Sequence, residues 1–124
     1  MKILIPVSLG ELYDKISILE IKLANMDSPE KIANVANEYK QLRKVSEDHP
    51  INDGLYQTLH SVNKLIWDVE DERRQYERDK DFGEGFIKVS RDVHFLNDER
   101  AAIKKNINTV YESEIIEEKS YKKY

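Results

Sequence analysis

The spacing of apolar residues constrains the fold of this chain more than any other feature. Through four separate segments these residues recur at alternating steps of three and four, which places them on one face of an α-helix. In the first segment the repeating residues are Leu12, Ile16, Leu19, Leu23 and Met26. The pairs Ser28-Pro29 and His49-Pro50 and the glycine-containing DKDFGEG stretch separate the segments. We therefore predict helices over residues 9–26, 29–48, 54–79 and 84–112.

The first seven residues, MKILIPV, have a different pattern. Their apolar residues are typical of one short strand, and Pro6 would confine that strand to the edge of a sheet. No second strand follows, and Gly10 stands alone where a phosphate-binding loop needs several glycines. These observations exclude a nucleotide-binding α/β domain. We predict one all-α domain over residues 1–124, an antiparallel four-helix bundle with a short extended N-terminal segment (1–8) and a tail (113–124).

Charge and composition narrow the class of protein. The net charge of -4 argues against broad nucleic-acid binding, which needs a basic face. No apolar run is long enough to span a membrane, and no signal peptide is recognisable. The absence of cysteine fits a reducing compartment. We expect a soluble cytoplasmic protein that binds neither nucleic acid nor membrane.

Four segments of the chain resemble a known family. They are PVSLGELYDKISILEIK (6–22), NKLIWDVEDERR (63–74), NDERAAIKKNIN (97–108) and EEKSY (117–121). Together they are similar to a domain-of-unknown-function family of small helical proteins from bacteria and bacterial viruses. The resemblance implies a helical domain in a bacterial or phage protein, and it brings no activity with it.

Polar residues form a second stripe on each of the two long helices. If these helices make a hairpin that turns near residue 82, the numbers of facing residues should add up to roughly 163, because both helices rise equally per residue. Asn63 then lies near Arg100, and Glu70 lies near His94. The predicted polar cluster contains Asn63, Trp67, Glu70, Arg74, His94, Asn97, Arg100 and Lys104.

This cluster has two interpretations. In the first it is a structural network, in which carboxylates or amides satisfy Arg100 and fix the register of the helices. In the second it is a ligand site, in which Arg100 and Lys104 hold an anion while Trp67 stacks on a ring or sugar.

Motifs for catalysis are weak. No Glu stands three residues before a histidine, as di-iron bundles require. Glu11 and Asp14 are the one pair in the helical part with the spacing of a magnesium-binding Glu-x-x-Asp motif, and a lone pair is weak evidence. His60 and His94 lack a Ser or Cys nucleophile implied by the sequence. We assign no catalytic residue and no metal ligand, expect no cofactor, and do not predict an enzyme.

The unequal helix lengths indicate a surface for association. The first two predicted helices are shorter than the last two, so part of the long helices and the N-terminal segment remain available to a second copy. The leading hypothesis is a non-enzymatic binding or assembly module that forms a homodimer or docks on a protein partner. The alternative is a small-molecule binding protein or enzyme that acts on a nucleotide or sugar phosphate at the polar cluster.

Overall fold

The computed structural model describes residues 1–124 as four α-helices without a strand. The helices are α1 (Leu9–Asn25), α2 (Pro29–Ser46), α3 (Asp53–Arg78) and α4 (Glu84–Val110). The prediction of an all-α protein with four helices is thus confirmed. None of the four helices combines the length and the apolar character that crossing a membrane requires.

The helices start at the capping signals of the sequence. Ser8 precedes α1, and its Oγ accepts a hydrogen bond from the Glu11 N–H at 3.1 Å. Asn52 precedes α3 and accepts one from the Leu55 N–H at 3.3 Å. Pro29 occupies the first turn of α2, where its missing N–H removes no helical bond. Local chemistry therefore sets where these helices begin.

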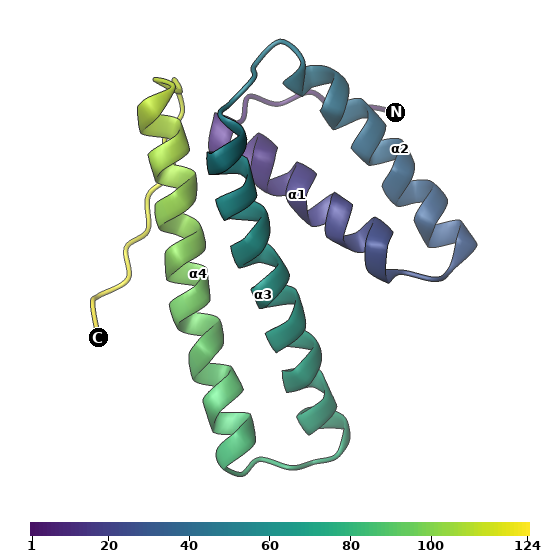
Figure 1. Cartoon of the computed structure of the whole chain (residues 1–124), viewed down its shortest axis with the longest axis vertical. Coiled ribbons are helices and arrows are strands. Elements are labelled where there is room, and N and C mark those ends of the chain that lie inside the picture. Colours follow the sequence, from purple (N-terminus) through teal and green to yellow (C-terminus); the bar gives the residue numbers. More distant parts are fainter.

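The four helices form two hairpins of unequal length. In Figure 1, α3 and α4 lie side by side and run in opposite directions; α1 lies beside the upper part of this pair, and α2 lies on the far side of α1. The first helix packs against all three others, whereas α2 packs against α1 alone. Because α2 has this single neighbour, Val35 is the one apolar residue that α2 buries. The lower half of the α3–α4 hairpin extends beyond the first hairpin (Figure 1).

The core lies where α1 crosses the long hairpin. Its six buried residues come from α1, α3 and α4: Leu12, Tyr13, Ile16, Leu59, Val62 and Ile107. The Tyr13 hydroxyl also donates to the His49 carbonyl oxygen at 2.7 Å, which ties the end of the first hairpin to the core. The crossing helix α1 therefore carries the packing that joins the two hairpins.

The start of α1 lies very close to α4 at Gly10. A Cβ atom on Gly10 would stand 2.6 Å from the Lys104 carbonyl oxygen, so no larger residue fits without a shift of the helices. The Gly10 N–H donates to Asn108 Oδ1 at 2.6 Å, and the Leu9 N–H donates to Ser113 Oγ at 3.1 Å. Residues from the far end of the chain thus satisfy the free N–H groups at the start of this helix.

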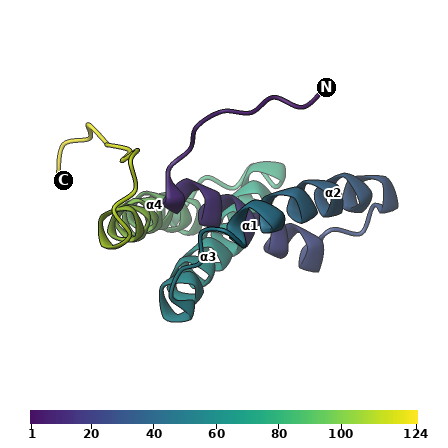
Figure 2. The same cartoon turned by 90° about the horizontal axis from the view of Figure 1, so that it is seen from above.

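The short strand that the first seven residues suggested does not form. Residues 1–8 have no regular secondary structure, and Figure 2 shows this segment standing clear of the helices. Ile3, Leu4 and Ile5 are 76%, 84% and 69% exposed. A strand needs a neighbouring strand to pair its N–H and C=O groups, and this all-helical chain offers none.

Candidate functional site

A buried carboxylate on α1 is the centre of the main polar cluster. Asp14 is 1% exposed, and Arg100 on α4 donates to both of its oxygens, with Nε 2.9 Å from Oδ1 and Nη2 2.5 Å from Oδ2. Asn63 on α3 donates from Nδ2 to the same Oδ1 at 2.9 Å. Bidentate arginine–carboxylate pairs are strong and geometrically specific. This contact therefore fixes three helices relative to one another.

A serine completes the hydrogen bonding behind Asp14. Ser17 Oγ accepts from Asn63 Nδ2 at 2.7 Å and donates to the Asp14 carbonyl oxygen at 2.8 Å. Every buried side-chain nitrogen and oxygen of the protein has a hydrogen-bond partner. The buried part of the cluster thus offers a ligand no unsatisfied polar atom.

Lys104 extends the cluster from α4 to the C-terminal tail (residues 113–124). Its Nζ lies 2.6 Å from Glu11 Oε2, 3.6 Å from Glu117 Oε2 and 3.8 Å from Asp14 Oδ2. Ser8 Oγ donates to Glu117 Oε1 at 2.7 Å, which joins the root of the N-terminal segment to the tail. We call the whole set the Asp14 network: Ser8, Glu11, Asp14, Ser17, Asn63, Arg100, Lys104 and Glu117.

The charges of the Asp14 network largely cancel. Burial by itself raises the pKa of the Asp14 carboxyl, but the hydrogen bonds from Arg100 and Asn63 and the charges of Arg100 and Lys104 together outweigh it. The pKa of Asp14 therefore lies below its usual value. The hydrogen bond to Asp14 raises the pKa of Arg100 against the opposing effect of burial. Since carboxylates already bind Arg100 and Lys104, neither cation is free to hold an external anion.

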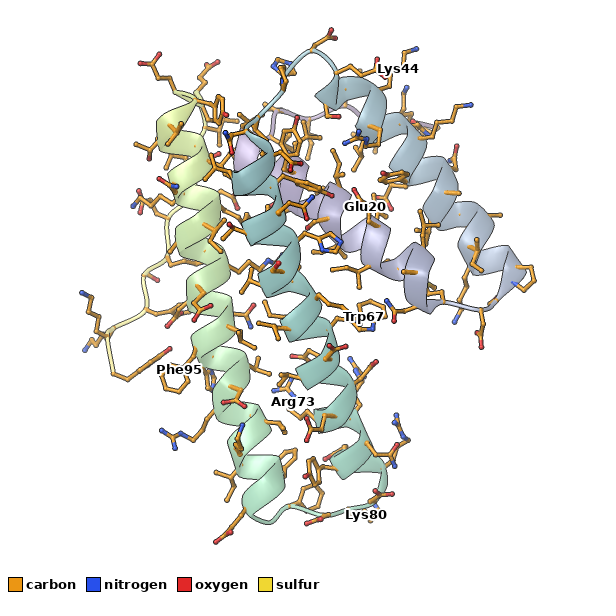
Figure 3. The ribbon with its side chains drawn as sticks, viewed as in Figure 1. Glu20, Lys44, Trp67, Arg73, Lys80 and Phe95 are labelled. Carbon is orange, nitrogen blue, oxygen red and sulfur yellow. The ribbon has the colours of Figure 1, made fainter.

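The structure divides the predicted polar cluster between two pockets that share Arg100. Asn63 and Arg100 meet at Asp14 Oδ1, as the hairpin arithmetic predicted. A pocket of about 320 Å³ on the α1 side is lined by Asn63, Trp67, Glu70, Arg74 and Arg100 among others. Figure 3 shows that Trp67 extends from α3 on the side of the first hairpin.

A second, larger pocket lies between α4 and the tail. Its volume is about 630 Å³, and its lining contains the other predicted residues, His94, Asn97 and Lys104. The eight predicted residues therefore do not surround one cavity. Glu70 pairs with Arg73 at 3.0 Å and forms no ion pair with Arg74.

Sequence reasoning noted Glu11 and Asp14 only as a weak magnesium motif and did not place them in the polar cluster. Gly10, Asp14, Ser17 and Ile21 follow one another at steps of four, three and four, and all are buried. This second stripe of α1 contains small and polar residues, so a search for apolar periodicity overlooks it. The steps of four, three and four place these residues on one face of α1, and this regular spacing was the signal in the sequence that could have revealed the stripe.

A separate carboxylate binds two tyrosines at the other end of α1. The hydroxyls of Tyr56 and Tyr39 both donate to Glu20 Oε1 (Figure 3 labels Glu20). Burial, and then the hydrogen bond to Glu20, raise the pKa of Tyr56. The Tyr56 ring lies edge-to-face with His60, with ring centroids 6.2 Å apart. His60 is therefore part of an aromatic cluster.

The acidic residues do not gather in a way that could hold a metal ion. No group of three or more histidine, cysteine, aspartate or glutamate side chains has that arrangement. The Glu11–Asp14 pair, whose spacing resembles a magnesium motif, faces Lys104 and Arg100.

One comparison with known proteins gives a match. A family model described as "Family of unknown function (DUF6165)" matches residues 1–124. No curated protein and no solved structure is detectably similar to the chain. The prediction that the chain resembles a family of unknown function is thereby confirmed.

Proposed function

The chain belongs to the DUF6165 family, a family of unknown function, and we propose that it is a binding and assembly module whose N-terminal segment docks on a second copy of the chain. The observation that carries this proposal is the exposure of that segment. Five of residues 1–7 are apolar, and four of these side chains are 69% exposed or more. Contiguous exposed apolar surface marks sites of association, since its burial gains about 25 cal/mol per Å².

The segment projects from a fixed root. Ser8, Leu9 and Gly10 are hydrogen-bonded to Glu117, Ser113 and Asn108. These contacts hold the start of α1, so the direction in which residues 1–7 leave the protein is limited. A restricted segment loses less conformational entropy when a partner binds it.

The chain also presents an uncovered surface that such a segment fits. Ile87 and Phe95, 54% and 45% exposed, are the two apolar residues of a groove of about 420 Å³ on α4, whose other lining residues are charged. They lie about 12 Å apart along the helix at about 1.5 Å per residue. Five extended residues, Ile3 to Val7, span about 16 Å at about 3.3 Å per residue. The segment is therefore long enough to cover this groove.

A second copy accounts for both surfaces at once. Each chain carries one segment and one groove, so two copies related by a two-fold axis bury two segments in two grooves and close the assembly. A different protein that bound only the segment would leave the groove exposed. For this reason we favour a homodimer over docking on another partner.

Analytical ultracentrifugation tests the proposal directly. We expect the wild type to sediment with about twice the 14.6 kDa chain mass at micromolar concentration. The double variant Ile3→Asp/Ile5→Asp should sediment as a single chain and keep its helical circular dichroism, because both side chains are exposed. Lys2→Glu is the matched control, since it changes the net charge by the same two units and keeps the apolar residues. A wild-type protein that stays at the single-chain mass up to high micromolar concentration would refute the homodimer.

A further inference from the structure

The pocket between α4 and the tail has the dimensions of a small-molecule site. Its volume of about 630 Å³ falls in the range of about 300–1,000 Å³ that is usual for ligand pockets. One wall comes from α4 and includes His94 and Arg100; the other comes from the tail and includes Lys119, Tyr121 and Lys122. The Asp14 network holds this part of the tail near α4, because Glu117 accepts from Ser8 and faces Lys104 at 3.6 Å.

The tail supplies the cations of this pocket that remain free. Arg100 and Lys104 line it as well, but Asp14 and Glu11 bind them at 2.5 and 2.6 Å. Neither Lys119 nor Lys122 forms an ion pair, whereas Lys105 nearby is paired with Glu118 at 2.8 Å. On a chain of net charge -4, two unpaired lysines beside one pocket make a local site of positive potential. Such a site favours a phosphate or another compact anion.

Aromatic rings stand beside these lysines. Tyr124 packs edge-to-face on Phe95, with ring centroids 5.2 Å apart, and its hydroxyl donates to Asp98. Figure 3 shows Phe95 on the side of α4 that faces the tail. Asp98 is the one acidic side chain that lines the pocket, and it keeps its charge beside the four basic side chains of Arg100, Lys104, Lys119 and Lys122. The Tyr121 ring is 75% exposed and has no ring partner, so its face is free to stack on a planar group.

We propose that this pocket binds a nucleotide, with its phosphate groups on Lys119 and Lys122 and its base stacked on Tyr121. A phosphate alone would use the lysines and leave the tyrosine wall uncovered. A nucleoside alone would stack on Tyr121 and leave the lysines without an anion. Only a ligand that carries both groups uses both features of the pocket. The argument for this pocket does not rest on self-association through the N-terminal segment, although Phe95 of the proposed docking groove packs against Tyr124 of the pocket.

Isothermal titration calorimetry with three probes at one fixed salt concentration tests this assignment. We expect ADP to bind at least tenfold more tightly than either inorganic phosphate or adenosine. Inorganic phosphate binding as tightly as ADP would reduce the site to a simple anion site and overturn the proposal. Adenosine binding as tightly as ADP would overturn it as well, and so would the absence of saturable binding of ADP at millimolar concentration.

Matched variants locate the binding. The double variant Lys119→Ala/Lys122→Ala should weaken ADP binding at least tenfold, because it removes both free cations. Lys123→Ala is the control: Lys123 adjoins the same segment and carries the same charge, but it does not line the pocket. Tyr121→Leu should weaken ADP binding and leave the weak binding of phosphate unchanged. The single variant Lys119→Ala removes the same one charge as Lys123→Ala, so equal losses of affinity in these two variants would show an effect of overall charge and overturn the assignment to this pocket.

Discussion

At Asp14 three helices meet through a single carboxylate. It belongs to α1, and it accepts hydrogen bonds from Asn63 on α3 and Arg100 on α4. Removing a carboxylate and a guanidinium from water is costly, and their attraction often does no more than balance that cost. The geometry of the pair is nevertheless specific, because only one relative position of α1 and α4 allows both hydrogen bonds. We infer that the pair fixes the register of the helices rather than adding much net stability.

Although the intact pair adds little net stability, removal of Arg100 alone should destabilise the fold, because it leaves the other charge buried without a partner. In Arg100→Ala, Asp14 stays buried and loses the cation that compensates its charge. We expect the free energy of unfolding to fall by about 3 kcal/mol, at the low end for a broken buried pair because Arg100 is partly exposed. Urea denaturation followed by circular dichroism measures this change.

A matched control on the same helix is Arg91→Ala. Arg91 is exposed and contacts the Phe95 ring, so its removal should cost less than about 0.5 kcal/mol. If Arg100→Ala were as stable as the wild type, the structural interpretation would be wrong, and the ligand interpretation of Arg100 would regain weight.

The lowered pKa of Asp14 predicts a pH dependence. The value in the folded protein lies below the usual 3.8, which we assign to the unfolded chain. The stabilisation is then fully present above that value and is lost as the pH falls through the folded pKa. We expect the unfolding free energy of the wild type to fall more steeply below about pH 4 than that of Asp14→Asn. Urea denaturation at a series of pH values measures both, and parallel curves would contradict this role of Asp14.

How much of the site could be predicted depends on which contacts are local. Asn63 and Arg100 face each other within one hairpin, so equal rise along both helices was enough to bring them together. The partner of Arg100 could not be derived in this way. Asp14 lies on α1, and its position depends on the angle at which α1 crosses the long hairpin. No spacing within a single helix encodes that angle.

At the scale of elements, the helices follow from local signals, while their arrangement does not. Caps such as Ser8 and Asn52 and the three–four spacing of apolar residues act within one helix, so they were visible in the sequence. The strand expected near Ile3 required a partner strand that the chain does not contain. The helix α2 packs against α1 alone and buries few residues. The spacing of apolar residues in α2 did not reveal that it has so few neighbours.

The close approach of α1 and α4 predicts a large effect of a small substitution. In Gly10→Ala the new Cβ would lie 2.6 Å from the backbone carbonyl oxygen of Lys104, so one helix must move. We expect a loss of about 1–3 kcal/mol, the usual cost of overpacking. Thermal and urea unfolding measure it.

Gly83→Ala serves as the comparison, because its Cβ would meet only an Asp81 side-chain oxygen, at 3.3 Å. A loss in Gly10→Ala no larger than in Gly83→Ala would show that the two helices separate easily.

At the scale of the whole molecule, the root of the N-terminal segment and the C-terminal tail meet beside α4. The Ser8–Glu117 hydrogen bond joins the root of the N-terminal segment to the tail, and Lys104 lies beside it. The same region thus supports the segment that we propose for dimerisation and the tail that closes the proposed nucleotide pocket. Below it, the long hairpin of α3 and α4 extends past the first hairpin (Figure 1). Apolar side chains such as Phe82 and Ile87 are exposed on this part of the protein. The surfaces that we assign to binding all lie outside the packed core.

Amide hydrogen exchange at Ile3, Leu4, Ile5 and Val7 tests whether a second copy of the chain buries the N-terminal segment. In the single chain these residues have no regular secondary structure and are exposed, so their amides should exchange at the rates of an unstructured peptide. We predict that exchange slows markedly as the concentration rises through the range in which the mass doubles. Rapid exchange at these four amides in a protein of doubled mass would contradict the account, because the dimer would then form through another surface.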